Sequence, residues 1–249
     1  MAKSTDVCML IDQSLCVNCE ACTAVCKQIY NVSPGLFRTK IHEQETGSFP
    51  EVISAYNKKA CLHCTDAACV MACPTGALGK VPNGLTVINN SICIKCNYCA
   101  ANCPYGAISF DRSKNVMEKC DLCFGRIEEG LDPFCAEVCT TRAIKYGSRE
   151  EMMVAGQNRV ADLQEQGFAE ANFYGVQELG GLGVLTVLTG SPDKHLLPVD
   201  PTISGGLRIW RALPLTPIAV IVGGTIMAFN FLHSRKVQGE VQKKQSKNK

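Results

Sequence analysis

Cysteine is the residue type in this chain whose number and spacing could do chemistry. Seventeen of the 249 residues are cysteines, and sixteen of them fall into four groups of four. Each group begins with two cysteines separated by two residues and ends with two separated by three. Such side chains form disulfides, bind zinc or hold iron–sulfur clusters, so three uses compete for them.

The spacing favours iron–sulfur clusters. Zinc ribbons use two C-x2-C pairs and need no further cysteine. The third group, CIKCNYCAANCP, instead has the C-x2-C-x2-C-x3-C-P spacing in which three thiolates hold one [4Fe–4S] cluster and the fourth ligates a neighbouring cluster. The N-terminal sequence MAKSTDVCML lacks an apolar signal core, which predicts a cytoplasmic start with reduced thiols and counts against disulfides.

Sixteen thiolates suffice for four [4Fe–4S] clusters if the fourth cysteine of each group crosses to another cluster. Groups two and three are close in the chain and are predicted to exchange their fourth cysteines, while groups one and four form an outer pair. The predicted ligand sets are set 1 (Cys16, Cys19, Cys22, Cys139), set 2 (Cys61, Cys64, Cys69, Cys103), set 3 (Cys93, Cys96, Cys99, Cys73) and set 4 (Cys120, Cys123, Cys135, Cys26). The alternative, in which group one exchanges its fourth cysteine with group two and group three with group four, stays open at this point.

Repeated segments predict a duplicated fold. LIDQSLC at 10–16 is echoed by VINNSIC at 87–93, and CPTGAL, CPYGAI and CTTRAI begin at the last cysteine of three groups. Short apolar, β-branched segments around the cysteine loops indicate an α+β fold made of two bacterial-ferredoxin-like units. We predict that this four-cluster double ferredoxin-like domain spans residues 1–147.

A helix–strand extension is predicted over residues 148–206. Ser148 and Glu151 form a capping-box pattern, and Gly167 follows at the other end of the helix. Residues 183–190, GVLTVLTG, are predicted to form a strand.

Three side chains outside the sixteen predicted ligands have simple interpretations. Cys8 lies in an apolar run and is expected to be a small buried side chain. His63 stands between two predicted ligands; since no cysteine is missing for it to replace, it is expected either to support them or to face solvent. Lys119 lies close to the predicted clusters and could raise their potentials through its charge, but it is expected on a solvated surface.

An uncharged segment near the C-terminus predicts a single transmembrane helix. Ala212 to Leu232 contains no charged residue and would span roughly 32 Å as a helix, enough for a hydrocarbon layer of about 30 Å. We place the helix at 207–235 and a basic tail, facing cytoplasmic lipid headgroups, at 236–249. Six basic residues follow the segment and three precede it, which predicts a cytoplasmic C-terminus and an extracytoplasmic cluster domain. Export would then depend on a partner that carries the signal.

The remaining sequence contains no other catalytic motif. The formal net charge is +2, and nothing indicates a nucleic-acid partner. The sequence has no G-x-G-x-x-G motif, P-loop or nucleophile elbow. Because four thiolates on each cluster leave no iron open to a substrate, the clusters are predicted to carry electrons, with catalysis on another subunit.

Several segments resemble a known family. CLHCTDAAC at 61–69, KCDLC at 119–123 and RIEEGLDPFCAEVC at 126–139 resemble the iron–sulfur β subunits of the molybdopterin oxidoreductase (DMSO-reductase-like) family. REEMMVAGQNRVADLQEQGFAEANFYG at 149–175 resembles the β subunit of membrane-bound formate dehydrogenase. The resemblance implies electron transfer from a molybdenum- or tungsten-pterin catalytic subunit, which carries the export signal, to a membrane cytochrome b that reduces quinone. It also implies a series that begins at set 1, continues through sets 2 and 3 and ends at set 4 near the membrane.

Two alternatives remain at the level of sequence. The same electron conduit could serve a nickel–iron hydrogenase or a reductase of sulfur compounds. A membrane-tethered redox sensor that signals through the basic tail is an interpretation from another class.

Overall fold

The computed structural model describes residues 6–207 of the chain. A compact unit ends at Ser204, and the fold below is that of this unit. The uncharged segment from Ala212 to Leu232 and the basic tail lie outside the described residues. Within residues 6–207, no helix has both the length and the apolar character needed to cross a membrane.

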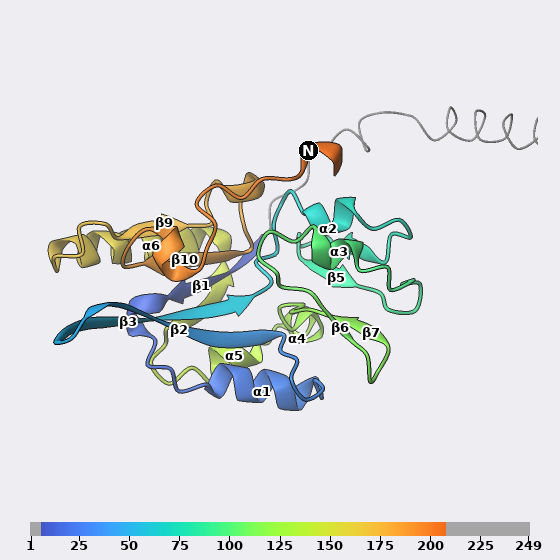
Figure 1. Ribbon diagram of the computed structural model, residues 1–249, viewed down its shortest axis with the longest axis horizontal. Helices are drawn as coiled ribbons and strands as arrows, with labels where there is room; N and C mark the ends of the chain where they lie inside the picture. Colours follow the sequence, from blue (N-terminus) through green and yellow to red (C-terminus); the bar gives the residue numbers. More distant parts are fainter. Residues whose placement is uncertain (1–5, 208–249) are drawn as a thin grey trace, which may run out of the picture. The chain divides into compact units, whose positions relative to one another are not determined.

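A four-stranded sheet forms the centre of the fold (Figure 1). Its strands are β8 (Ile144–Ser148), β1 (Val7–Asp12), β10 (Val184–Leu188) and β9 (Asn172–Tyr174), in that order across the sheet. The predicted strand at 183–190 is confirmed as β10. It pairs in parallel with β1, with Leu10 opposite Leu185, so the extension and the start of the cysteine-rich region share one sheet.

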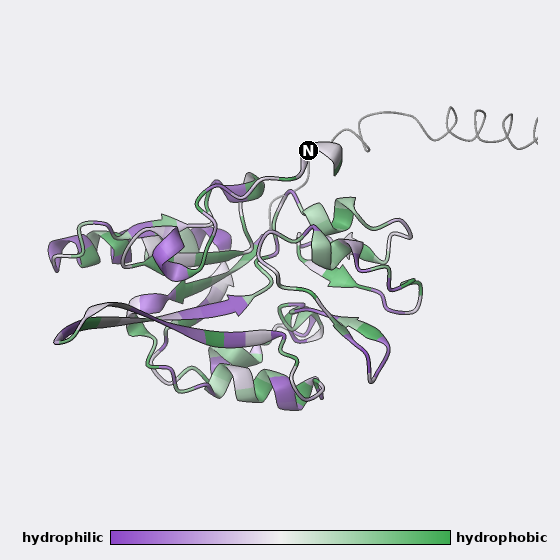
Figure 2. Cartoon of the chain, viewed as in Figure 1, coloured by the Kyte–Doolittle hydropathy of each residue, from purple (hydrophilic) through white to green (hydrophobic). Residues whose placement is uncertain are grey.

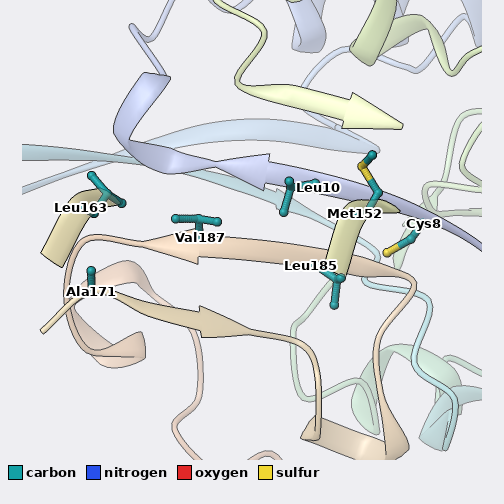
Figure 3. Packing of buried hydrophobic residues seen from close by; sticks show 7 residues of the cluster. All are labelled: Cys8, Leu10, Met152, Leu163, Ala171, Leu185 and Val187. Carbon is teal, nitrogen blue, oxygen red and sulfur yellow. The ribbon is translucent and has the colours of Figure 1, made fainter. Parts of the chain in front are cut away.

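The long helix α6 (Arg149–Glu165) covers one face of this sheet. The predicted capping box is confirmed: the Ser148 hydroxyl accepts from the Glu151 amide, and the Glu151 carboxylate accepts from the Ser148 amide. Met152 and Leu163 pack with Leu185 in a buried cluster (Figure 3). Cys8, fully buried in the same cluster, is the small apolar side chain that the sequence predicted.

Short elements carry the cysteine loops. On one side are the hairpins β4 (Leu78–Lys80)/β5 (Thr86–Ile88) and β6 (Ser109–Asp111)/β7 (Val116–Glu118), with helices α2 (Ala68–Met71) and α3 (Tyr98–Ala101). The other cysteine helices are α1 (Ala21–Ile29), α4 (Phe124–Glu128) and α5 (Phe134–Glu137). Three 3₁₀ turns, η1 (Gln13–Leu15), η2 (Glu178–Gly180) and η3 (Pro192–His195), complete the elements within residues 6–207.

A long hairpin that the sequence analysis did not predict crosses the molecule. Strands β2 (Thr39–Ser48) and β3 (Glu51–Ala60) pair along their whole length, from Thr39 opposite Ala60 to Ser48 opposite Glu51. β2 contacts α1, and β3 contacts η1. Much of the hairpin is hydrophilic (Figure 2), although one of its faces lies against cysteines.

Candidate metal centres

The four cysteine groups share one local backbone feature. The second residue after the first cysteine of each group has a positive φ: 54° at Asn18, 51° at His63, 60° at Lys95 and 57° at Leu122. Residues other than glycine adopt this left-handed conformation only rarely. Its recurrence at four equivalent positions shows that the C-x2-C segments fold as the same loop.

Backbone amides of these loops point at sulfur. The amides of Lys95 and Leu122 each donate to the first cysteine of their group, at 3.4 Å from the Sγ atoms of Cys93 and Cys120. The fourth cysteines of groups two and three also accept a backbone amide: Leu78 donates to the sulfur of Cys73 and Ala107 to that of Cys103, each at 3.5 Å. Amide donors at sulfur favour the thiolate and are one of the ways in which a protein tunes a cluster.

The structure brings the members of each predicted set together. One hollow is lined by the four cysteines of set 1, a second by those of set 3 and a third by those of set 4. The four cysteines of set 2 also lie close to one another, as the pKa of the Cys64 thiol shows. Burial raises this pKa, and the nearby sulfurs of Cys61, Cys69 and Cys103 raise it further. These are the groupings expected if group one exchanges with four and two with three; the role of each cysteine as a ligand remains our prediction.

The donor chemistry fits [4Fe–4S] clusters. None of the cysteines is in a disulfide. Burial raises the thiol pKa of Cys26 to about 12, and it also raises the pKa of Cys22, Cys120 and Cys135. Bound iron would supply the positive charge that keeps such buried sulfurs deprotonated. Within the described part of the chain, no three Cys, His, Asp or Glu side chains converge on a single metal ion.

Two lysines lie buried near the thiols. Lys119 is 3% exposed and donates to the carbonyl oxygens of Thr86 at 2.5 Å and Cys120 at 2.6 Å, so the expected solvated position is wrong. Lys58 is also buried. Burial opposes its charge, but the negative charge of Cys135 and Cys120 as thiolates, among others, raises the pKa of Lys58 above its ordinary value. A lysine in a polar strand gives no sequence signal of such a position.

His63 supports its loop from inside the protein. Its side chain is fully buried, and its Nδ1 accepts from the Thr86 amide at 3.1 Å. Burial, reinforced by the charge of Lys119, lowers the pKa of His63 well below its ordinary value, so the imidazole is neutral. Of the two expectations for His63, the solvent-facing one is wrong.

Packing between the sets defines a sequence in space. Lys58 lines the hollows of both set 1 and set 4. Cys120 of set 4 packs with Cys61 of set 2 in one group of buried side chains. Cys69 of set 2 packs with Cys93 of set 3 in another. The packing contacts therefore run 1–4–2–3. This differs from the order that the resemblance implied, which placed set 4 after sets 2 and 3.

Comparison with known proteins agrees with this chemistry. Residues 52–149 match the model of the 4Fe-4S dicluster domain. The formate dehydrogenase iron–sulfur subunit of Haemophilus influenzae is 31% identical, with 90% of this chain and 78% of the relative aligned. The iron–sulfur subunit of the nitrate-inducible formate dehydrogenase of Escherichia coli is 32% identical, with 86% of this chain and 79% of the relative aligned.

A third relative comes from a reductase. A subunit of the anaerobic dimethyl sulfoxide reductase of Escherichia coli is 37% identical over 57% of this chain and 73% of its own length. The fold is thus an α+β, ferredoxin-like [4Fe–4S] dicluster fold. Identity above 30% over most of two formate dehydrogenase relatives identifies the chain as a member of the electron-transferring iron–sulfur subunit family of formate dehydrogenases and dimethyl sulfoxide reductases.

Proposed function

We propose that this chain carries four [4Fe–4S] clusters, one on each predicted set, and relays electrons within a formate dehydrogenase complex. The observation that carries the proposal is the convergence of sixteen thiols into four sets of four. Four thiolates on each cluster leave no iron position for a substrate. The chain is then a conduit, and formate is oxidised on a molybdenum- or tungsten-pterin subunit.

The arrangement of the sets supports a relay. Each set touches the next through shared packing or a shared side chain, so electrons would pass between neighbouring clusters in the order 1–4–2–3. Electrons enter at set 1, beside the catalytic subunit, and leave from set 3 towards a membrane cytochrome b that reduces quinone.

The extent of similarity supports formate as the electron source. The two formate dehydrogenase relatives align with 86% and 90% of the chain, whereas the dimethyl sulfoxide reductase subunit aligns with 57%. The higher identity of the latter, 37%, supports a second candidate in which the same conduit serves a reductase and electrons run in the opposite direction.

The uncharged segment from Ala212 to Leu232 supports a membrane location. It would cross the membrane once, with the cluster region outside and the basic tail in the cytoplasm, after export with the catalytic subunit. Deletion of residues 212–249 tests this point. The shortened chain should appear in the soluble fraction with its iron, and its retention on membranes that lack the partner subunits would contradict the proposal.

Low-temperature EPR on anaerobic membranes tests the function. Formate, hydrogen or a reduced quinol would be added separately to membranes with the wild-type chain or with Cys96→Ser. Formate should reduce the [4Fe–4S] signals of the wild type, and the variant should lose the response of set 3. Cys8→Ser, a buried cysteine outside the sets, is the control and should respond like the wild type. Reduction by hydrogen alone would point to a hydrogenase partner, and reduction by quinol alone to a reductase.

A further inference from the structure

Lys58 lies on the face of the β2–β3 hairpin that contacts the cysteines. It is directly opposite Ile41 in the antiparallel register, and both residues line the hollow of set 1 together with Tyr56. Directly opposed residues in a sheet share a face, and their chain neighbours point to the other one. His42, Asn57 and Lys59 border a further cavity of about 410 Å³, and Lys58 also contributes to its lining.

The position of Lys58 joins two cysteine sets. Its side chain is 9% exposed. Of the described residues that line the hollows of sets 1 and 4, it is the only one common to both. Cys135, Cys120 and Cys26 of set 4 and Cys22 of set 1 are the nearby sulfurs that, as thiolates, would favour its positive charge.

The charge of Lys58 has no carboxylate counterion in the described part of the chain. The ion pairs there involve arginines and Lys194, and none includes Lys58. A buried ammonium is costly unless an opposite charge lies nearby. A [4Fe–4S] core with four thiolates carries net negative charge, so two such clusters would be the counterions of this lysine.

We propose that Lys58 is a shared electrostatic element that raises the reduction potentials of the set 1 and set 4 clusters together. The proposal rests on the function proposed above, since it needs clusters on both sets. A one-electron reduction makes a cluster more negative, and a fixed positive charge beside it stabilises the reduced form more than the oxidised one. One charge between two clusters would shift both potentials in the same direction.

The test is a redox titration of the complex in membranes, followed by low-temperature EPR. Lys58→Met removes the charge and keeps much of the length of the side chain, while Lys58→Arg keeps the charge. Lys59→Met is the matched control, because Lys59 is exposed, follows Lys58 in the same strand and lines neither the set 1 nor the set 4 hollow. Signals are assigned with Cys19→Ala, Cys123→Ala and Cys96→Ala, which remove one ligand of sets 1, 4 and 3.

In Lys58→Met, the midpoint potentials of sets 1 and 4 should both fall, while that of set 3 stays unchanged. Lys58→Arg should keep both potentials near those of the wild type, and Lys59→Met should leave them unaltered. Unchanged potentials in Lys58→Met, or a shift of only one of the two, would overturn the inference. So would loss of iron in both Lys58→Met and Lys58→Gln but not in Lys58→Arg, because Lys58 would then serve cluster assembly.

Iron content separates this result from a failure of the proposed function. A wild-type chain with fewer than four clusters would refute the function itself, whatever Lys58 does. Four clusters in every variant with identical potentials would refute only the role of Lys58.

Discussion

At the scale of single residues, Cys103 distinguishes crossed from uncrossed ligation. It follows Cys93, Cys96 and Cys99 in the chain, yet it lies near Cys64 and Cys69 of set 2 and helps to raise the pKa of both thiols. Its sulfur accepts the Ala107 amide in the way that Cys73 accepts the Leu78 amide in the partner group. The chain therefore delivers this sulfur to the neighbouring set.

Replacement of Cys103 should remove the cluster of set 2 and spare that of set 3. In Cys103→Ala the set 2 cluster would lose one of its four thiolates, whereas all four of set 3 stay in place. Iron content and EPR of the purified complex would measure this. Cys8→Ala is the control: burial raises the pKa of the Cys8 thiol to about 11, so it stays protonated at neutral pH, and its loss should leave every signal intact. Selective loss of the set 3 signal would contradict crossed ligation.

Spacing predicted the cysteine sets but not the side chains around them. Ligand spacing within a loop is local, and four repeats of it give the groups without any knowledge of tertiary structure. The burial of Lys58, Lys119 and His63 depends on which strand or loop covers them, and that is decided by contacts far along the chain. A polar segment such as YNKKA looks like a solvated strand when it is taken alone.

At the scale of elements, α6 was predictable and the β2–β3 hairpin was not. The capping box that begins α6 is a signal of four residues, and the glycine that follows its last turn is another. The hairpin strands TKIHEQETGS and EVISAYNKKA have few apolar residues at alternate positions, so the pattern typical of a half-buried strand is weak. The buried part of the hairpin lies against the cysteine loops on one side and, at Asn57, against His195 of η3 on the other.

Gly156 shows how closely α6 packs on the sheet. A Cβ atom at this position would lie 2.3 Å from ring carbons of Phe173 on β9. Alanine alone would favour the helix by about 1 kcal/mol, but such overpacking costs about 1–3 kcal/mol. Gly156→Ala should therefore lower the midpoint of thermal unfolding, measured by circular dichroism under anaerobic conditions.

Gly125 in α4 provides the matched control for Gly156→Ala. An added Cβ there meets nothing within 4 Å, so Gly125→Ala should not destabilise the protein. The double variant Gly156→Ala/Phe173→Leu should recover part of the loss because the smaller side chain makes room. If Gly156→Ala unfolded at the wild-type temperature or above, the close approach of α6 to β9 would not limit stability.

At the scale of the whole molecule, the strands of the extension complete the fold that holds the sets. β10 lies between β1 and β9, and its buried Leu185 and Val187 pack against α6. The start of the cysteine-rich region and the extension thus share one core. Sequence indicated both parts, but not that a strand near the end would pair in parallel with the first one, because such pairing depends on chain topology.

The order of the sets predicts what happens when one cluster is removed. In the series 1–4–2–3, set 4 is the link between set 1 and the other two. Cys123→Ala should remove its cluster, so formate would reduce the cluster of set 1 but no longer those of sets 2 and 3. A strong chemical reductant would still reduce all three, which shows that they are present.

Cys96→Ala is the matched variant at the end of the series. It should remove the cluster of set 3 and leave sets 1, 4 and 2 reducible by formate, because no other cluster depends on set 3 for its electrons. Rapid-freeze EPR after formate addition compares the two variants directly. If sets 2 and 3 of Cys123→Ala were reduced by formate as fast as in the wild type, set 4 would not lie on the route. The packing of Cys61 against Cys120 would then hold the two halves of the protein together without carrying electrons between them.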